Sequence, residues 1–150
     1  MKYSKLMSAL CGLSLAGTIA VGAQAAEVAQ YSIVDETIPA SLTGKAGDAA
    51  NGKKIVIHRK KGNCLACHVM PIPEQQFHGK TGPDLAGVAH RMDEATLRMR
   101  VVDPKVINDH TMMPSFYKTG QHRVLKKFQG KTILSAQEVE DVVAYLLTLN

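Results

Sequence analysis

The sequence predicts an all-α fold preceded by an extended N-terminal arm. Three segments, residues 48–59, 93–102 and 135–149, repeat apolar side chains at the three- and four-residue spacing of a helix. The connections between them are rich in glycine and proline, which excludes long helices there. No run of residues alternates apolar and polar side chains as a half-buried strand does. We therefore expect helices joined by long loops.

The first two predicted helices have clear start and stop signals. Asp48 can cap a helix that runs to about Arg59, before Gly62-Asn63. Asp93 can cap a second helix, and Asp103-Pro104 should end it because proline cannot continue a helix. Residues 26–46 show no clear period and are expected to form the arm.

The last predicted helix has the strongest pattern. Ser135 and Glu138 make a capping box at its start. Its apolar face consists of Val139, Val142, Val143, Leu146 and Leu149. The preceding residues 103–132 predict a loop with one short helical turn.

The first 25 residues are typical of a secretory signal peptide. Lys2 and Lys5 precede an apolar stretch from Leu6 to Val21, and Ala23-Gln24-Ala25 provides a small-x-small cleavage site. A membrane helix is the rival interpretation, but small and polar residues interrupt the stretch. We expect a periplasmic protein whose single domain spans residues 47–150.

The composition narrows the class of function. The formal net charge of +5 includes Lys2 and Lys5, so cleavage leaves a charge of +3, which does not indicate a nucleic-acid binder. No later segment is long and apolar enough to insert into a membrane. Aromatic residues make up only 5% of the chain, so a buried planar cofactor would supply much of the apolar core.

The segment Cys64-Leu65-Ala66-Cys67-His68 is the most specific motif in the chain. Two thiols two residues apart, followed by a histidine, form the attachment signature of a c-type haem. Each cysteine sulfur can form a thioether bond to the porphyrin, and His68 can then ligate the iron. A thioredoxin-like thiol pair would need a βαβ context, and a zinc site would need a second ligand pair. The chain offers neither, since its only other cysteine is Cys11 in the predicted signal peptide.

The second axial ligand of the iron is expected among the methionines. Met112 and Met113 precede Pro114 in a loop far enough from His68 to reach the opposite side of the ring, and Met113 is our choice, with Met112 second. Met70 follows His68 too closely, and Met92 and Met99 belong to or flank the second helix, where methionine usually fills a core. Three histidines remain alternatives: His78, His90 and His110.

Other short motifs lie at characteristic places around the attachment signature. They are Gly47-Asp48, Gly52, Gly82-Pro83-Asp84-Leu85 and Met113-Pro114. With Cys64–His68, they resemble the class I cytochromes c. Four further stretches resemble, more narrowly, the SoxX family, the small monohaem subunits of SoxXA cytochrome complexes: Phe77-His78-Gly79, Met113–Tyr117, Phe128–Lys131 and Leu134–Leu146.

This resemblance implies a cytochrome c fold around one covalently attached haem c. It also implies a partner, a larger SoxA-type cytochrome that contains the catalytic haem, in an enzyme of the L-cysteine S-thiosulfotransferase type. This chain would have no catalytic residue. It would accept the electrons released when thiosulfate is joined to a cysteine of a carrier protein and pass them to a small cytochrome c. The alternative is a free, diffusible periplasmic cytochrome c that serves a terminal oxidase or a photosynthetic centre. A haem-free dithiol oxidoreductase is a third interpretation.

Three more expectations concern the surroundings of the haem. Gly82-Pro83 should turn the chain so that a backbone carbonyl accepts the Nδ1 hydrogen of His68. The first and last helices should cross at Gly52, with Val142, Tyr145 and Leu146 opposite, as the class I architecture implies. A basic cluster before the attachment site either steers an acidic redox partner or is a solvated surface; it comprises Lys53, Lys54, Arg59, Lys60 and Lys61.

Overall fold

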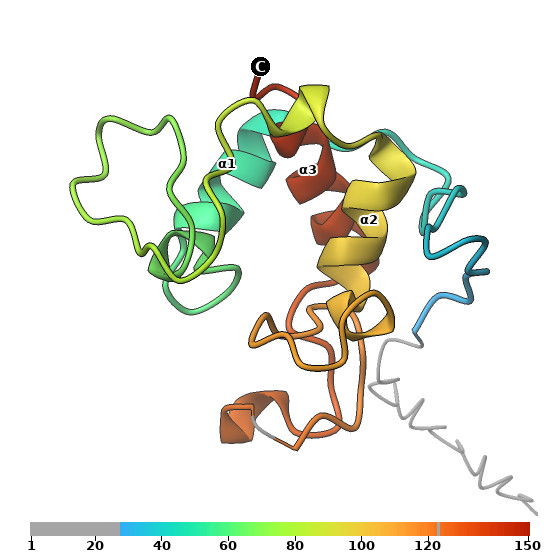
Figure 1. Ribbon diagram of the computed structural model, residues 1–150. Coiled ribbons are helices and arrows are strands. Elements are labelled where there is room, and N and C mark those ends of the chain that lie inside the picture. The colour runs from blue at the N-terminus through green and yellow to red at the C-terminus, as the bar shows by residue number, and fades with distance from the viewer. Residues whose placement is uncertain (1–27, 123) are drawn as a thin grey trace, which may run out of the picture.

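The computed structural model describes residues 28–122 and 124–150, so the predicted signal peptide lies outside the described residues. Figure 1 shows three α-helices: α1 (Ala49–Ile57), α2 (Glu94–Val102) and α3 (Ala136–Leu146). Long connections join them, with four 3₁₀ turns: η1 (Cys64–Ala66), η2 (Val88–His90), η3 (Pro104–Val106) and η4 (Lys126–Phe128). The only β pairing in the described parts of the chain is an isolated bridge between Val34 and Thr37. The predicted all-α class is confirmed.

The three helices begin where the sequence predicts. The Asp48 carboxylate accepts hydrogen bonds from the backbone N–H groups of Ala50 and Asn51, and the Asp93 side chain caps α2 in the same way through Thr96. Ser135 and Glu138 form both bonds of the capping box. The end of α1 differs from the prediction: the helix ends at Ile57, because the backbone of His58 is already extended.

α1 and α3 cross at close range, and theirs is the most extensive contact between helices in the described part of the chain (Figure 1). Gly52 lies in the crossing, where a Cβ would be 2.0 Å from the carbonyl oxygen of Asp141 and 2.8 Å from the Cβ of Tyr145. The expected glycine contact is therefore confirmed, with Tyr145 opposite. The backbone nearest to Gly52 belongs to Asp141. Val142 and Leu146, which were also expected opposite Gly52, contribute none of the three atoms closest to it.

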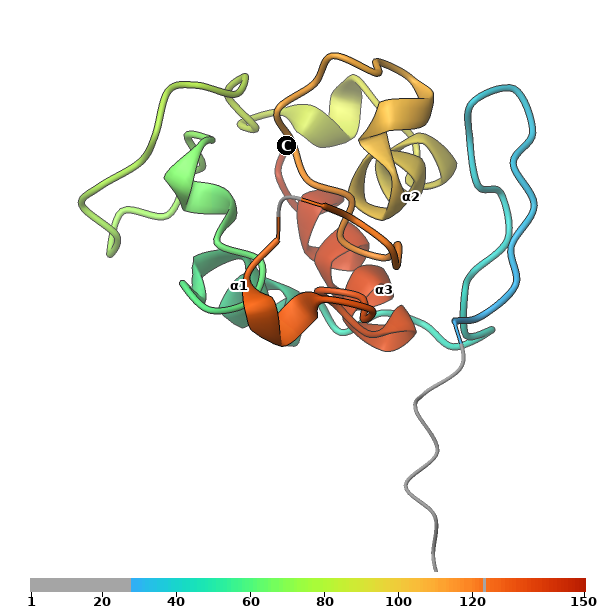
Figure 2. The same cartoon turned by 90° about the horizontal axis from the view of Figure 1, so that it is seen from below.

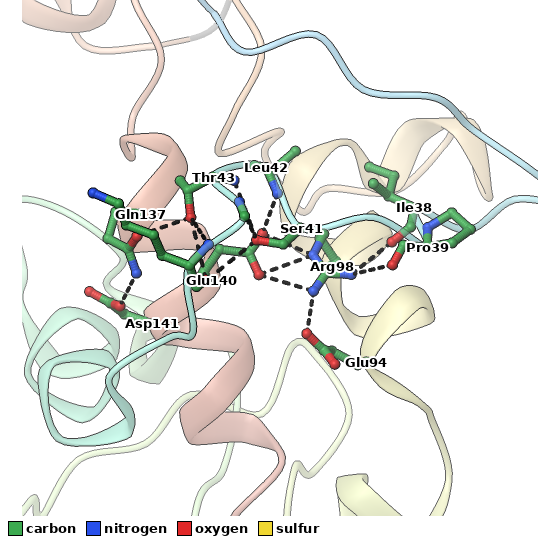
Figure 3. Close-up of polar contacts among 12 residues, drawn as sticks. Ile38, Pro39, Ser41, Leu42, Thr43, Glu94, Arg98, Gln137, Glu140 and Asp141 are labelled. Atoms are coloured by element: carbon green, nitrogen blue, oxygen red, sulfur yellow. Dashed lines mark hydrogen bonds and ion pairs between the residues drawn. The ribbon is translucent and has the colours of Figure 1, made fainter.

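The arm packs against the side of α2 and α3 that faces away from the segment following His68 (Figure 2). Ile38 is fully buried and Leu42 nearly so, so the arm contributes two side chains to the core. A buried ion pair lies beneath it, in which Arg98 of α2 donates from Nε to Glu140 of α3 at 2.9 Å (Figure 3). The same guanidinium donates to the carbonyl oxygen of Ile38 at 2.8 Å, and Glu140 accepts from the backbone N–H of Leu42 at 2.8 Å. The pair thus joins two helices and the arm.

Candidate functional site

The attachment motif forms a single tight turn directly after α1. Asn63 adopts the left-handed conformation, with φ of 50°, and begins the 3₁₀ turn η1. The backbone N–H groups of Cys67 and His68 both donate to the carbonyl oxygen of Cys64, at 3.1 and 2.9 Å. This turn brings the two thiols and the imidazole to the same side of the chain.

Both thiols and His68 line one cavity of about 600 Å³, which Met112 and Met113 also line. α2 and α3 supply apolar walls through Leu97, Val101, Val142 and Leu146. The volume and the apolar lining are typical of a site for a sizeable organic ligand. Within residues 28–122 and 124–150, no three His, Cys, Asp or Glu side chains are grouped so as to hold a metal ion without such a ligand.

The imidazole of His68 is held in place from two sides. Its Nδ1 lies 2.8 Å from the carbonyl oxygen of Pro83, so this nitrogen donates a hydrogen bond and Nε2 remains free to ligate a metal. The expectation that the Gly82-Pro83 turn presents a backbone carbonyl to His68 is thus confirmed. Gly82 lies against the face of the ring, where a Cβ would be 2.4 Å from Cε1. Only glycine leaves room for the ring in this position.

The five methionines after His68 separate clearly by their surroundings. Met70 and Met99 are buried in the core, and Met92 is half-buried against it, as expected of methionines that fill space. Met113 is also half-buried and packs against the core, whereas 78% of the Met112 side chain is exposed. His78, His90 and His110 are not among the residues that line the cavity.

The surroundings of Cys64 do not suit a dithiol oxidoreductase. Burial of this thiol raises its pKa to about 12, and a reactive cysteine needs the opposite shift to form a thiolate at neutral pH. The elements of residues 28–122 and 124–150 also include no βαβ unit of the thioredoxin-like kind.

The loop around Met113 is held by polar contacts that sequence reasoning missed. The ammonium group of Lys105 donates to the carbonyl oxygens of Thr111 and Met113, at 2.8 and 3.3 Å. Beyond Met113, the Ser115 hydroxyl donates to the buried Asp103 carboxylate at 2.6 Å. In the sequence, Asp103 is visible only as a helix stop, because its partners come from residues later in the chain.

The ammonium group of Lys118 also donates to the Asp103 carboxylate, at 2.6 Å. Burial alone would raise the pKa of Asp103, but the hydrogen bonds from Lys118 and Ser115 outweigh it and hold that pKa below its ordinary value. Asp103 therefore stays ionised at neutral pH and links the end of α2 to the loop.

Two residues of the basic cluster predicted before the attachment site form ion pairs within the chain. Lys53 pairs with Glu74 at 2.6 Å and Lys61 pairs with Glu138. Two further basic residues of the cavity lie outside that cluster and were not predicted, Arg91 and Arg100. Arg91 donates to the carbonyl oxygens of Ala86 and Asp84, at 2.7 and 2.8 Å, and so fixes the loop after Pro83.

Comparisons with known proteins point to one family. Residues 49–150 match the family model of cytochrome c. The solved structure of SoxXA from P. pantotrophus contains a chain that is 40% identical, with a TM-score of 0.72, over 79% of this chain and 93% of that one. Ferric cytochrome c-550 from Paracoccus versutus is 27% identical over 69% of this chain and 98% of that one, but its TM-score of 0.39 is too low to inform the fold. Among curated proteins, no sequence matches significantly.

Proposed function

This chain belongs to the cytochrome c family, as a SoxX-type member with one covalently bound haem c, and on that premise we propose that it is the electron-transfer subunit of a SoxXA-type complex. In this role it accepts electrons released by the oxidative coupling of thiosulfate to a cysteine of a carrier protein. The similarity to a SoxXA chain over 93% of that chain supports the assignment. The complex would be a heterodimer of the L-cysteine S-thiosulfotransferase type.

The observation that carries the electron-transfer role is the shared cavity of Cys64, Cys67, His68 and Met113. We propose that the two cysteines form the thioether bonds and that His68 Nε2 is the first axial ligand. The hydrogen bond from Nδ1 to Pro83 leaves Nε2 available, and the missing Cβ of Gly82 makes room for the ring, so these residues fit the cofactor. When bound, the haem supplies a one-electron redox couple.

We propose Met113 as the second axial ligand. Its half-buried side chain lines the cavity, and Lys105 holds its carbonyl oxygen. Met112 is second because most of its side chain is exposed to solvent, although it lines the same cavity. His68 and Met113 together would fill both axial positions and leave no open position for a substrate. We therefore place catalysis in the partner subunit.

The partners and the location follow from the same assignment. The larger SoxA-type cytochrome would bind this chain directly, and the thiosulfate carrier would meet it through the complex. A small cytochrome c would take the electrons onward. The signal peptide proposed for residues 1–25 would deliver the protein to the periplasm. In the described part of the chain, no helix is of a length and hydrophobicity that could cross a membrane.

Co-purification distinguishes this role from that of a free carrier. The full-length precursor with a C-terminal affinity tag is produced in its native host, and the haem-staining proteins that elute with it are counted and weighed. A larger cytochrome in equimolar amount is the expected result. Thiosulfate and the carrier protein should then reduce the haem of the eluted complex. Elution of this chain alone, with no thiosulfate-dependent reduction after periplasmic extract is added back, would favour the free carrier.

A further inference from the structure

The loop that contains Met113 folds back around the side chain of Lys105. The Lys105 ammonium group donates hydrogen bonds to the carbonyl oxygens of Thr111 and Met113, at 2.8 and 3.3 Å. Within the described chain, Lys105 forms no ion pair with a carboxylate. An exposed lysine usually directs its charged end into water. Here the charged end is directed at the backbone of the loop instead.

Both backbone polar groups of Met113 are hydrogen-bonded within this short segment. Its N–H donates to the hydroxyl of Thr111 at 3.2 Å, and its carbonyl oxygen accepts from Lys105. Pro114 follows directly and restricts the backbone of Met113 further, because a residue before proline favours extended conformations. The half-buried side chain of Met113 is the part that lines the cavity. Lys105 therefore helps to fix the backbone from which this side chain extends.

Lys105 is itself anchored to the end of α2. Its backbone N–H donates to the carboxylate of Asp103 at 3.3 Å, and the N–H of Asp103 donates to the carbonyl oxygen of Met99 at 2.9 Å. Pro104, between the two, is buried in the 3₁₀ turn η3. Since α2 also supplies an apolar wall of the cavity, Lys105 connects that wall to the backbone of Met113.

We propose that Lys105 is a positioning residue for Met113 and limits how often another ligand can replace the methionine at the haem iron. This inference rests on the proposed haem site and on Met113 as the second axial ligand. An external ligand binds only the fraction of molecules in which the methionine has dissociated, so its apparent affinity is reduced by that fraction. A loop held by Lys105 keeps the fraction small and the iron closed to small molecules.

The test compares Lys105→Leu with Lys45→Leu, which removes the same charge from an exposed lysine that does not line the cavity. The oxidised holoproteins are titrated with imidazole, and the Soret band reports its dissociation constant. Lys105→Leu should bind imidazole about three- to ten-fold more tightly than the wild type, which corresponds to the loss of one net hydrogen bond. Lys45→Leu should stay within about two-fold of the wild type, since water and salt screen an exposed charge.

Two further variants separate positioning from general stability. Lys105→Arg should restore the wild-type imidazole affinity, because a guanidinium has enough donors for both carbonyl oxygens. Lys105→Gln, with a shorter and uncharged side chain, provides a second test if Lys105→Leu does not retain haem, and it should also bind imidazole more tightly. A merely structural role would lower the midpoint of urea unfolding and leave the imidazole affinity unchanged.

Imidazole affinities of Lys105→Leu and Lys105→Gln that equal that of Lys45→Leu would overturn the proposal, and so would a failure of Lys105→Arg to restore the wild-type value. Covalent haem content and the sulfur–iron absorption band of the wild type are measured in the same samples. Absence of either one would overturn the proposed haem site instead, so the two failures are distinguishable.

Discussion

Gly82 lies flat against the imidazole of His68, so close that a Cβ on the glycine would be 2.4 Å from Cε1 and 2.7 Å from Nδ1. The next residue, Pro83, accepts the hydrogen bond from the same nitrogen. Two consecutive residues thus set both the position and the rotation of the ring. A metal-ligating histidine is usually oriented by such a bond through its second nitrogen.

Gly82→Ala should therefore displace His68 and weaken its bond to iron. The added methyl group overlaps the ring, and overpacking of this kind costs about 1–3 kcal/mol. We expect a lower thermal midpoint and a changed ligand-field spectrum of the oxidised haem. Gly120→Ala is the control, because Gly120 has open space around it and a positive φ. It should lose only about 1–2 kcal/mol from the backbone and keep the wild-type spectrum. Identical spectra for wild type and Gly82→Ala would contradict the proposed ring position.

Gly52→Val should destabilise the domain through the helix crossing. The new Cβ would lie 2.0 Å from the carbonyl oxygen of Asp141, so α1 and α3 must move apart. Overpacking of this kind lowers the free energy of unfolding by about 1–3 kcal/mol. Ala50→Val is a matched control in the same helix, because Ala50 is exposed and its replacement changes only helix propensity. Urea unfolding of both variants measures the difference. Equal midpoints for the two would show that Gly52 is not a packing site.

The buried pair of Arg98 and Glu140 should be sensitive to the loss of one partner. Only 1% of the Arg98 side chain and 3% of the Glu140 side chain are exposed. Glu140→Ala leaves the guanidinium buried without its main counter-charge, which typically costs about 3–5 kcal/mol. Glu94→Ala removes the other carboxylate that pairs with Arg98, but this one is 59% exposed, so a loss of about 0–1 kcal/mol is expected. Chemical denaturation should show a larger loss of unfolding free energy in Glu140→Ala than in Glu94→Ala. A larger loss in Glu94→Ala would contradict the role of Glu140 as the main counter-charge of Arg98.

Asp103 makes the stability of the loop around Met113 depend on pH. The pKa of Asp103 is held below its ordinary value in the folded state, whereas the unfolded chain has an Asp pKa of about 3.9. The folded protein therefore binds the proton less readily. This contribution is present at neutral pH and is lost as pH falls from about 4 through the folded pKa.

Asp103→Asn should accordingly be less stable than the wild type at neutral pH and lose less stability on acidification. Unfolding curves recorded at pH 7 and at about pH 3 measure the two differences. Asp109→Asn removes a carboxylate that is 82% exposed, so it should follow the wild type at both values. An Asp103→Asn protein whose acid-induced loss equals that of the wild type would show that this carboxylate does not contribute.

The features that could be predicted from the sequence depend on residues close together in the chain. The caps at Asp48, Asp93 and Ser135 satisfy backbone groups within three positions, so their effect is local. The turn of Cys64–His68 is equally local. A backbone carbonyl from the Gly82-Pro83 turn was also predicted as the partner of His68, because this turn follows soon after the haem motif, and the structure identifies that carbonyl as the one of Pro83.

The features that the sequence did not predict depend on chain segments that meet only in the folded protein. Arg98 and Glu140 come from different helices, and neither is distinguished in sequence from a solvated charge. Ile38 and Leu42 show no periodicity, although both reach the core from the arm. At the crossing, the sequence indicated the glycine but not the rotation of α3, which places the backbone of Asp141 nearest to Gly52.

We propose that one haem iron lies between His68 and Met113, and X-ray absorption at the iron edge distinguishes the candidate ligands of that iron. The thioether sulfurs of Cys64 and Cys67 are bonded to the porphyrin and not to the iron, so a sulfur in the first coordination shell reports a methionine. We expect one such sulfur in the oxidised wild type and in Met112→Ala, and none in Met113→Ala, with covalent haem retained in all three. A sulfur that persists in Met113→Ala and disappears in Met112→Ala, or a wild-type iron with no sulfur ligand, would contradict the assignment.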